Sequence, residues 1–258
     1  MRIVRFSDGN DPQYGILEDD SERIYVLRGD PLFSQVEASG QVVNLDEVRL
    51  LSPVIPRSKV VCVGKNYADH IAEFDGITPE EPVLFLKPNT SVIGPDDPIV
   101  LPAWSKHVEH EAELAVVIKT LAKDVPVDQV PEVIFGYTIA NDVTARDKQI
   151  QDGQWTRAKG FDTSCPLGPW IIVDEDFDPN EVQVKALVNG EVRQDANTAA
   201  MITSVYELVS FISQMFTLLP GDVILTGTPE GVGPLIAGDR VEVSIEGIGT
   251  LSNPVVRR

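Results

Sequence analysis

Two acidic residues, Glu111 and Glu113, stand two positions apart at the polar entry to the apolar, β-branched run 114–118. A strand is predicted over residues 108–118, and residues two apart in a strand point to the same side of the sheet. Neighbouring carboxylates repel each other and resist burial unless they share a cation. Negatively charged oxygen ligands favour a hard divalent ion, Mg²⁺ first, with Mn²⁺ or Ca²⁺ as substitutes. The alternative is that both side chains lie on a solvated face.

A histidine and a glutamate, His70 and Glu73, stand three positions apart where the pattern changes from a strand at 59–64 towards a helix. A helical turn places both side chains on one face. A carboxylate beside an imidazole orients the ring and raises its basicity, so the pair can take a proton from water. The segment 75–82 is polar, contains a glycine and two prolines, and is typical of a mobile flap. The alternative is an exposed turn with a weak ion pair.

Three further polar residues, Asp142, Arg146 and Gln149, lie at and after the end of a strand predicted over 136–143. If the chain turns helical at Asp142, the three side chains share one face. A guanidinium binds carboxylate oxygens in a bidentate manner, so this group suits an anionic, oxygen-rich small molecule beside a metal. The alternative is an exposed first helical turn with an internal ion pair.

A lysine and a threonine complete the candidate residues. Lys159 lies among the aromatic and small residues of 155–162, where an ammonium can stabilise an enolate or oxyanion, although a surface salt bridge is the alternative. The glycine-rich segment 227–234 lacks the Gly-Lys-Ser/Thr of a nucleotide loop, and its two prolines remove backbone donors. This favours a turn whose backbone or Thr228 hydroxyl contacts a small ligand.

The elements that must position these residues indicate a fold class that is mainly β (α+β). With 258 residues, the chain allows one large domain or one large and one small domain. Residues 1–56 predict a small N-terminal β module with three short strands, and residues 57–258 form the larger domain. The one long helix is predicted over 204–218, with a capping box of Ser204 and Glu207. The βαβ repeats of a doubly wound fold are missing.

The composition limits the partners and the compartment. The net charge of −19 argues against nucleic acid and anionic membranes. No apolar run reaches membrane-spanning length, and the first residues lack the apolar core of a signal peptide, so we expect a cytoplasmic protein. Cys62 and Cys165 lie in apolar surroundings without CxxC spacing, which predicts buried free thiols.

Six motifs stand in a fixed order along residues 57–258. They are Gly64-Lys65-Asn66-Tyr67-Ala68-Asp69-His70, Phe85-Leu86-Lys87-Pro88, His110-Glu111-Ala112-Glu113-Leu114, Asn141-Asp142-Val143-Thr144-Ala145-Arg146-Asp147, Lys159-Gly160-Phe161-Asp162 and Leu225-Thr226-Gly227-Thr228-Pro229-Glu230-Gly231-Val232-Gly233. Together they resemble the fumarylacetoacetate hydrolase family. Within it, the chain is most similar to the branch of acylpyruvate hydrolases, oxaloacetate decarboxylases and 2-hydroxyhepta-2,4-diene-1,7-dioate isomerases.

The resemblance implies a mixed β-sandwich roll, usually a homodimer, and assigns roles to the candidate residues. It implies that Mg²⁺ is bound by Glu111, Glu113 and Asp142. It further implies an acid–base dyad of His70 and Glu73, a catalytic Lys159, and substrate contacts from Arg146, Gln149 and Thr228. Two departures concern the substrate: Lys65 stands where many relatives have arginine, and Glu230 where many have lysine.

The resemblance implies an enzyme that acts on a small 2-oxo acid through a metal-bound enolate. Three reactions share that enolate: C–C hydrolysis of an acylpyruvate, decarboxylation of oxaloacetate, and tautomerisation of a hydroxydienoate. The His70–Glu73 pair favours hydrolysis or decarboxylation over isomerisation. The alternative from another class is a non-catalytic, dimeric module in which the carboxylates hold a structural cation.

Overall fold

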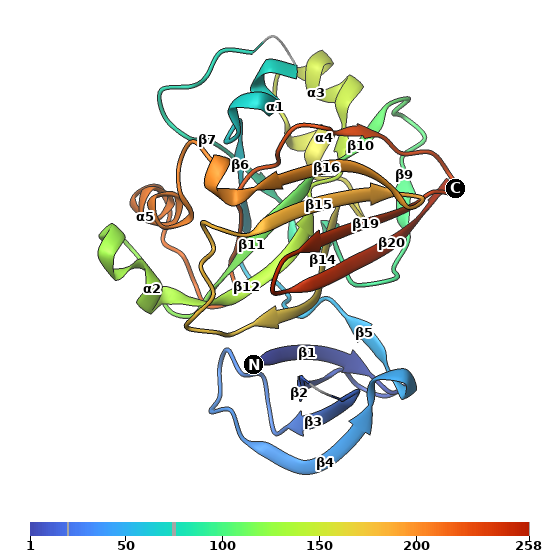
Figure 1. Cartoon of the computed structure of the whole chain (residues 1–258), viewed down its shortest axis with the longest axis vertical. Coiled ribbons are helices and arrows are strands. Elements are labelled where there is room, and N and C mark those ends of the chain that lie inside the picture. The colour runs from blue at the N-terminus through green and yellow to red at the C-terminus, as the bar shows by residue number, and fades with distance from the viewer. Residues whose placement is uncertain (20, 74–75, 258) are drawn as a thin grey trace.

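The computed structural model describes residues 1–19, 21–73 and 76–257, and it confirms a mainly β fold (Figure 1). A 12-stranded sheet dominates it. From edge to edge, ten of its strands are β4 (Ala38–Asn44), β3 (Arg23–Leu27), β2 (Gln13–Leu17), β1 (Arg2–Ser7), β14 (Cys165–Ile172), β12 (Ile134–Asn141), β11 (Ala112–Ile118), β17 (Val223–Leu225), β6 (Val60–Gly64) and β7 (Val83–Lys87). Two short strands complete it, because β5 (Arg49–Leu51) pairs with β1 and β8 (Val92–Ile93) with β14.

Two smaller sheets and a few helices complete the fold. The five-stranded sheet has the order β16 (Glu191–Asn197), β15 (Gln183–Val188), β19 (Arg240–Ile245), β20 (Gly249–Arg257) and β9 (Ile99–Leu101), and the three-stranded one has the order β13 (Thr144–Ala145), β10 (Val108–His110) and β18 (Gly233–Pro234). The α-helices are α1 (Ala68–Glu73), α2 (Val130–Val133), α3 (Arg146–Asp152), α4 (Thr156–Lys159) and α5 (Val205–Met215), and the 3₁₀-helices are Leu45–Glu47, Asn89–Ser91, Val127–Gln129 and Thr198–Ala200.

Strand β11 lies between two apolar cores, which explains why its sequence is apolar without interruption from Leu114 to Ile118. Leu114 and Val116 belong to a core shared with α5 and with strands β15 and β19 of the five-stranded sheet. Ala115 and Val117 belong to a second core on the opposite face. Successive side chains of a strand alternate between faces, so a strand covered on both sides carries apolar residues throughout. Sheet packed on sheet over a common core is the predicted sandwich.

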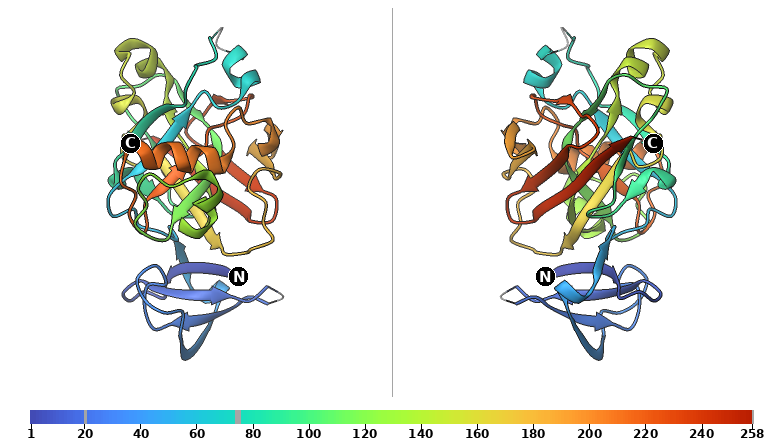
Figure 2. Two further views of the ribbon diagram at one scale, coloured as in Figure 1. Left: turned by 90° about the vertical axis from the view of Figure 1, so that its left-hand side faces the viewer. Right: turned by 90° about the vertical axis from the view of Figure 1, so that its right-hand side faces the viewer.

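The N-terminal strands extend the large sheet instead of standing free. Strand β1 pairs antiparallel with β14, and Ile3 lies opposite Ile171. Figure 2 shows these strands at one end of the molecule and helices α1 and α3 at the other. The sequence predicted β1, β2 and β3 but missed β4 and β5. Strand β4 is mostly exposed, so its sequence lacks the alternation that burial imposes.

Local features of the chain agree with the predictions from its sequence at some positions and differ from them at others. Ser204 caps α5 with Glu207 as predicted, but the helix ends at Met215 because Phe216 is extended. No helix begins at Asp142: β12 ends at Asn141, β13 spans Thr144–Ala145, and α3 begins only at Arg146. Cys62 and Cys165 are buried and free. Among the described residues, no helix is long and apolar enough to cross a membrane.

Candidate active site and metal centre

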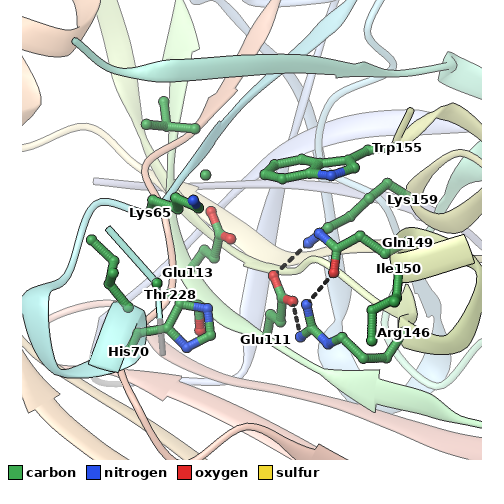
Figure 3. Close-up of a pocket in the computed structure, with 14 residues that line it drawn as sticks. Lys65, His70, Glu111, Glu113, Arg146, Gln149, Ile150, Trp155, Lys159 and Thr228 are labelled. Atoms are coloured by element: carbon green, nitrogen blue, oxygen red, sulfur yellow. Dashed lines mark hydrogen bonds and ion pairs between the residues drawn. The ribbon is translucent and has the colours of Figure 1, made fainter. Parts of the chain in front are cut away.

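The candidate residues meet around a cavity of about 270 Å³ at one end of strands β6 and β11 (Figure 3). Its lining includes seven of the nine predicted site residues: His70, Glu111, Glu113, Arg146, Gln149, Lys159 and Thr228. Apolar side chains such as Val63, Ile71, Ile150 and Trp155 complete the walls. The other two predicted residues are not part of the lining but contact it, Asp142 through Lys159 and Glu73 through His70.

Two carboxylates of the lining, Glu111 and Glu113, together with Asp142 close to them, form the floor of the cavity. Ligand oxygens of Glu111, Glu113 and Asp142 lie within 4.8 Å of one another, and all three residues are buried. The prediction of one continuous strand over 108–118 is wrong, because the chain changes sheet partners at Glu111. Before it, β10 pairs with β13 and β18; after it, β11 pairs with β12 and β17. The Glu111 N–H donates instead to Asn141 Oδ1 at 3.0 Å.

Two buried lysines contact these carboxylates. Lys159 Nζ lies 2.6 Å from Glu111 Oε2 and 2.7 Å from Asp142 Oδ2. Lys87 Nζ lies 2.5 Å from Asp142 Oδ1. Burial lowers the pKa of Lys159, but Asp142 and Glu111 outweigh it, so the pKa lies above its ordinary value. Lys87 was missed as a site residue, although a lysine in an otherwise apolar strand was a signal that it needed a buried anion.

The three carboxylates of the floor outnumber the two lysines that contact them. Burial and the charges of Asp142 and Glu111 raise the pKa of Glu113 well above its ordinary value. Burial also raises the pKa of Glu111, but Lys159 and Arg146 outweigh it and the pKa falls below its ordinary value. Among the described residues, the cluster that could hold a metal ion consists of three carboxylates and includes no histidine or cysteine. This oxygen donor set fits a hard divalent cation.

Arg146 holds one of the carboxylates in place. Its Nη2 donates to Glu111 Oε1 at 2.5 Å, its Nε to Glu109 Oε2 at 2.7 Å and its Nη1 to Gln149 Oε1 at 2.5 Å. The guanidinium is buried, so these partners fix its plane. The structure therefore gives Arg146 a positioning role at Glu111 and leaves its predicted substrate contact untested. Glu109 was missed, although it continues the alternation of acidic residues at 109, 111 and 113.

The predicted dyad lies on the outer wall of the cavity. His70 Nδ1 is 3.1 Å from Glu73 Oε2, and the other oxygen of Glu73 accepts the Gly231 N–H at 2.7 Å. The loop after β17 thus fixes the carboxylate that orients the imidazole. Gly231 has φ +89°, and a Cβ there would lie 2.1 Å from the Arg193 carbonyl oxygen, so only glycine fits.

The remaining predictions concern the rim of the cavity. Of the predicted flap 75–82, residue 75 lies outside the described residues, and Gly76 lines the cavity. Lys65, which also lines it, is exposed and has φ +61°, a left-handed conformation that is uncommon for a non-glycine residue. Glu230 is half-buried in the loop after β17 and does not belong to the lining.

Comparison with known proteins gives two family matches. Residues 59–256 match the family described as Fumarylacetoacetate (FAA) hydrolase C-terminal. Residues 1–53 match the family described as Rv2993c-like, N-terminal.

Three proteins illustrate what this chain is similar to. A 5-carboxymethyl-2-hydroxymuconate delta-isomerase structure from Mycobacterium smegmatis is 50% identical, with a TM-score of 0.92 over 100% of both chains. Oxaloacetate tautomerase Fahd2a, mitochondrial, from Rattus norvegicus is 43% identical over 83% of this chain and 72% of its own. Maleylpyruvate hydrolase from Sphingobium sp. SYK-6, solved with manganese(II) and pyruvate, is 30% identical, with a TM-score of 0.82 over 100% of this chain and 99% of its own.

Proposed function

Since this chain belongs to the fumarylacetoacetate hydrolase family, we propose that it is a divalent-cation-dependent enzyme that converts a small 2-oxo acid by way of its enolate. The observation that carries this proposal is the cluster of Glu111, Glu113 and Asp142 at the floor of a cavity whose outer wall holds His70. Relatives named as isomerase, tautomerase and hydrolase support an enzymatic role without fixing the reaction.

The three carboxylates would hold the cation, Mg²⁺ first or Mn²⁺ as in the maleylpyruvate hydrolase structure. When bound, a divalent cation supplies Lewis acidity to the oxygens of a 2-oxo acid. Lys159 would hold the positive charge of its ammonium beside the substrate oxygen at which negative charge develops. Arg146 would keep Glu111 in its orientation through the contact at 2.5 Å.

The dyad would move the proton. Glu73 accepts from Gly231 and from the His70 ring, so His70 Nε2 is the nitrogen that can act as a base. In hydrolysis of an acylpyruvate, His70 would take a proton from water as that water attacks the distal carbonyl. Decarboxylation of oxaloacetate needs no attacking water. Lys65, an exposed cation on the lining, suits an anionic substrate in either case.

The second candidate reaction is tautomerisation, and the 43% identity to an oxaloacetate tautomerase favours it. This reaction only moves a proton between carbon and oxygen of the 2-oxo acid. The same His70–Glu73 pair can carry that proton, so the geometry supports both candidates. They differ in their products, since hydrolysis and decarboxylation release pyruvate and tautomerisation does not.

The test is to add Mg²⁺ or Mn²⁺ back to metal-stripped protein and to follow acetylpyruvate and oxaloacetate by absorbance, with pyruvate quantified separately. We expect turnover only with the cation. Released pyruvate identifies hydrolysis or decarboxylation, and faster loss of the oxaloacetate enol without pyruvate identifies tautomerisation. If the cation raises the melting temperature but supports no turnover and no oxalate binding, the enzymatic proposal is wrong and the site is structural.

We also propose a homodimer, as the family resemblance implies. Sedimentation at micromolar concentration should then give twice the chain mass of 28.2 kDa. A monomer at that concentration would contradict this part of the proposal.

A further inference from the structure

A buried glutamine from the five-stranded sheet reaches the cavity wall with its amide in one fixed orientation. Gln194 Oε1 accepts the Ala112 N–H at 2.9 Å, and a backbone N–H is only a donor. Gln194 Nε2 lies 2.8 Å from the Pro229 carbonyl oxygen, which is only an acceptor. Exchanging the oxygen and nitrogen of the amide would therefore make both contacts repulsive. The side chain is fully buried, so water cannot relieve either one.

The orientation of this amide fixes its two other contacts. Gln194 Oε1 lies 3.1 Å from His110 Nδ1, so that nitrogen must carry the proton and donate. Gln194 Nε2 lies 2.8 Å from Thr228 Oγ1, so the threonine oxygen must accept. All four hydrogen-bonding positions of the amide are then used, and the glutamine cannot rotate without losing several of them.

The polarity of the Thr228 hydroxyl follows from the same reasoning. Its oxygen lies 2.9 Å from the Ala112 carbonyl oxygen, which only accepts, so the hydroxyl proton points there. One lone pair of Thr228 Oγ1 receives the Gln194 amide. A hydroxyl has one proton and two lone pairs, so what remains is a single lone pair. Thr228 lines the cavity, and its side-chain hydroxyl can offer a ligand only an acceptor.

We propose that Thr228 accepts a hydrogen bond from a hydroxyl group of the ligand and that Gln194 is the positioning residue that fixes this polarity. A carboxylate or ketone oxygen cannot donate, whereas the enol form of a 2-oxo acid carries a hydroxyl. This hydroxyl therefore favours the enol form, or a 2-hydroxy acid that resembles it, over a ligand without a donor at that position. This inference rests on the proposed function, because it takes the ligand to be a small 2-oxo acid.

The test compares two ligands that differ in one hydrogen-bond donor. Hydroxymalonate has a hydroxyl, and methoxymalonate has an ether oxygen in its place. Their dissociation constants are measured by calorimetry with Mg²⁺ present. The dissociation constant of methoxymalonate divided by that of hydroxymalonate is then compared among variants. A loss of affinity that a variant causes for both ligands does not change this ratio. The steric effect of the methoxymalonate methyl group enters the ratio of every variant, so it does not distinguish one variant from another.

We expect wild type to favour hydroxymalonate and Thr228→Ser to keep this preference. Thr228→Val preserves the shape of the side chain and removes the oxygen, so the ratio should fall by about three- to tenfold, as for one lost hydrogen bond. Gln194→Met should lower the ratio by less, because the threonine oxygen remains but its hydroxyl can now rotate. This intermediate result is one that a purely structural role of Gln194 would not give.

Each outcome decides something. An unchanged ratio in Thr228→Val overturns the inference, and an unchanged ratio in folded Gln194→Met overturns the role of Gln194. If Gln194→Met does not fold, the Thr228 pair still decides the main claim. Oxalate serves as the reference without a hydroxyl. If oxalate binds but wild type shows no preference, only this inference fails; if no ligand binds with Mg²⁺ present, the proposed function fails with it.

Discussion

The cavity has a floor and an outer wall that are built in opposite ways. The floor consists of Glu111, Glu113 and Asp142, and Lys159 is paired with two of them; all four residues are at most 3% exposed. The outer wall holds His70 and Glu73 on α1, with side chains that are 11% and 33% exposed. The floor is fixed by two cores and a network of ion pairs, whereas the dyad is held to the protein through the loop after β17.

This difference separates two chemical tasks. Charges that stabilise a developing anion work best in a dry, rigid frame, because such a frame does not reorganise during the reaction. A group that exchanges protons with water must stay within reach of water. We therefore expect changes in the floor to affect cation binding and turnover together, and changes in the outer wall to affect turnover alone.

The largest loss of turnover is expected from Glu113→Gln. Loss of one carboxylate should weaken cation binding and lower turnover by on the order of 10³-fold, since Lewis-acid stabilisation contributes several kcal/mol. The metal-free variant should unfold at the same or a higher temperature, because the neutral amide removes a buried charge that Asp142 and Glu111 repel. Calorimetry with Mg²⁺ and thermal unfolding measure the two effects.

Retention of wild-type cation affinity in this variant would show that the floor is not a metal centre. A lower melting temperature with unchanged activity would instead show that Glu113 only supports the fold.

The second largest loss of turnover is expected from His70→Gln. Turnover should fall by about 10²-fold, the lower end of what general acid–base catalysis contributes. Binding of Mg²⁺ and oxalate should remain at the wild-type level, since His70 lies on the outer wall and not in the carboxylate cluster. If cation affinity falls as far as turnover, the two regions are not independent, and the comparison between floor and wall is wrong.

Much of this arrangement could be predicted from the sequence because it depends on spacing along single elements. Glu111 and Glu113 are two apart beside a strand, and His70 and Glu73 are three apart on a helix. The fold class followed from the scarcity of helical periodicity. The resemblance, not spacing, brought Asp142 and Lys159 to the same centre. The structure places them together although the helical turn considered at Asp142 does not form.

What could not be predicted depends on contacts between distant segments. Gln194 lies 82 residues from Ala112, and no periodicity in β16 distinguishes it from its neighbours. Glu73 and Gly231 are 158 residues apart. The split at Glu111 arises because one segment pairs with two different sheets, a choice made by the partner strands rather than by the segment itself. Such contacts require the folded topology.

The third prediction sharpens the description of the outer wall. In Gly231→Ala, the new methyl group would meet the Arg193 carbonyl oxygen, so the loop must move and Glu73 loses its backbone donor. We expect about tenfold lower turnover, a fraction of the acid–base contribution, with cation binding unchanged. The matched control is Gly238→Ala, which has a similar φ of +101° but no atom within 4 Å of the added Cβ. Equal losses in both variants would attribute the effect to backbone strain alone.

The smallest expected effect is on the free energy of unfolding, and it concerns Asp147, which supports the helix that carries Arg146. Asp147 on α3 accepts from Ser105 Oγ at 2.5 Å and from the Lys106 N–H at 3.2 Å, and so fixes the helix that carries Arg146. Burial raises the pKa of Asp147, but these hydrogen bonds outweigh it, and the pKa lies below its ordinary value of 3.8. Asp147→Asn keeps the shape and removes the charge, so it should lower the free energy of unfolding by about 0.5 kcal/mol at neutral pH.

The sign of the pH dependence follows from the lowered pKa. The folded state binds the proton more weakly than the unfolded state, so the stability contributed by Asp147 is complete above pH 3.8 and is lost as the pH falls through the folded pKa. Wild type and Asp147→Asn should therefore differ in urea unfolding at pH 7 and converge in acid. A constant difference at all pH values would mean that the variant disturbs the packing of α3 rather than its charge. The floor would then depend on the shape of this contact and not on its electrostatics.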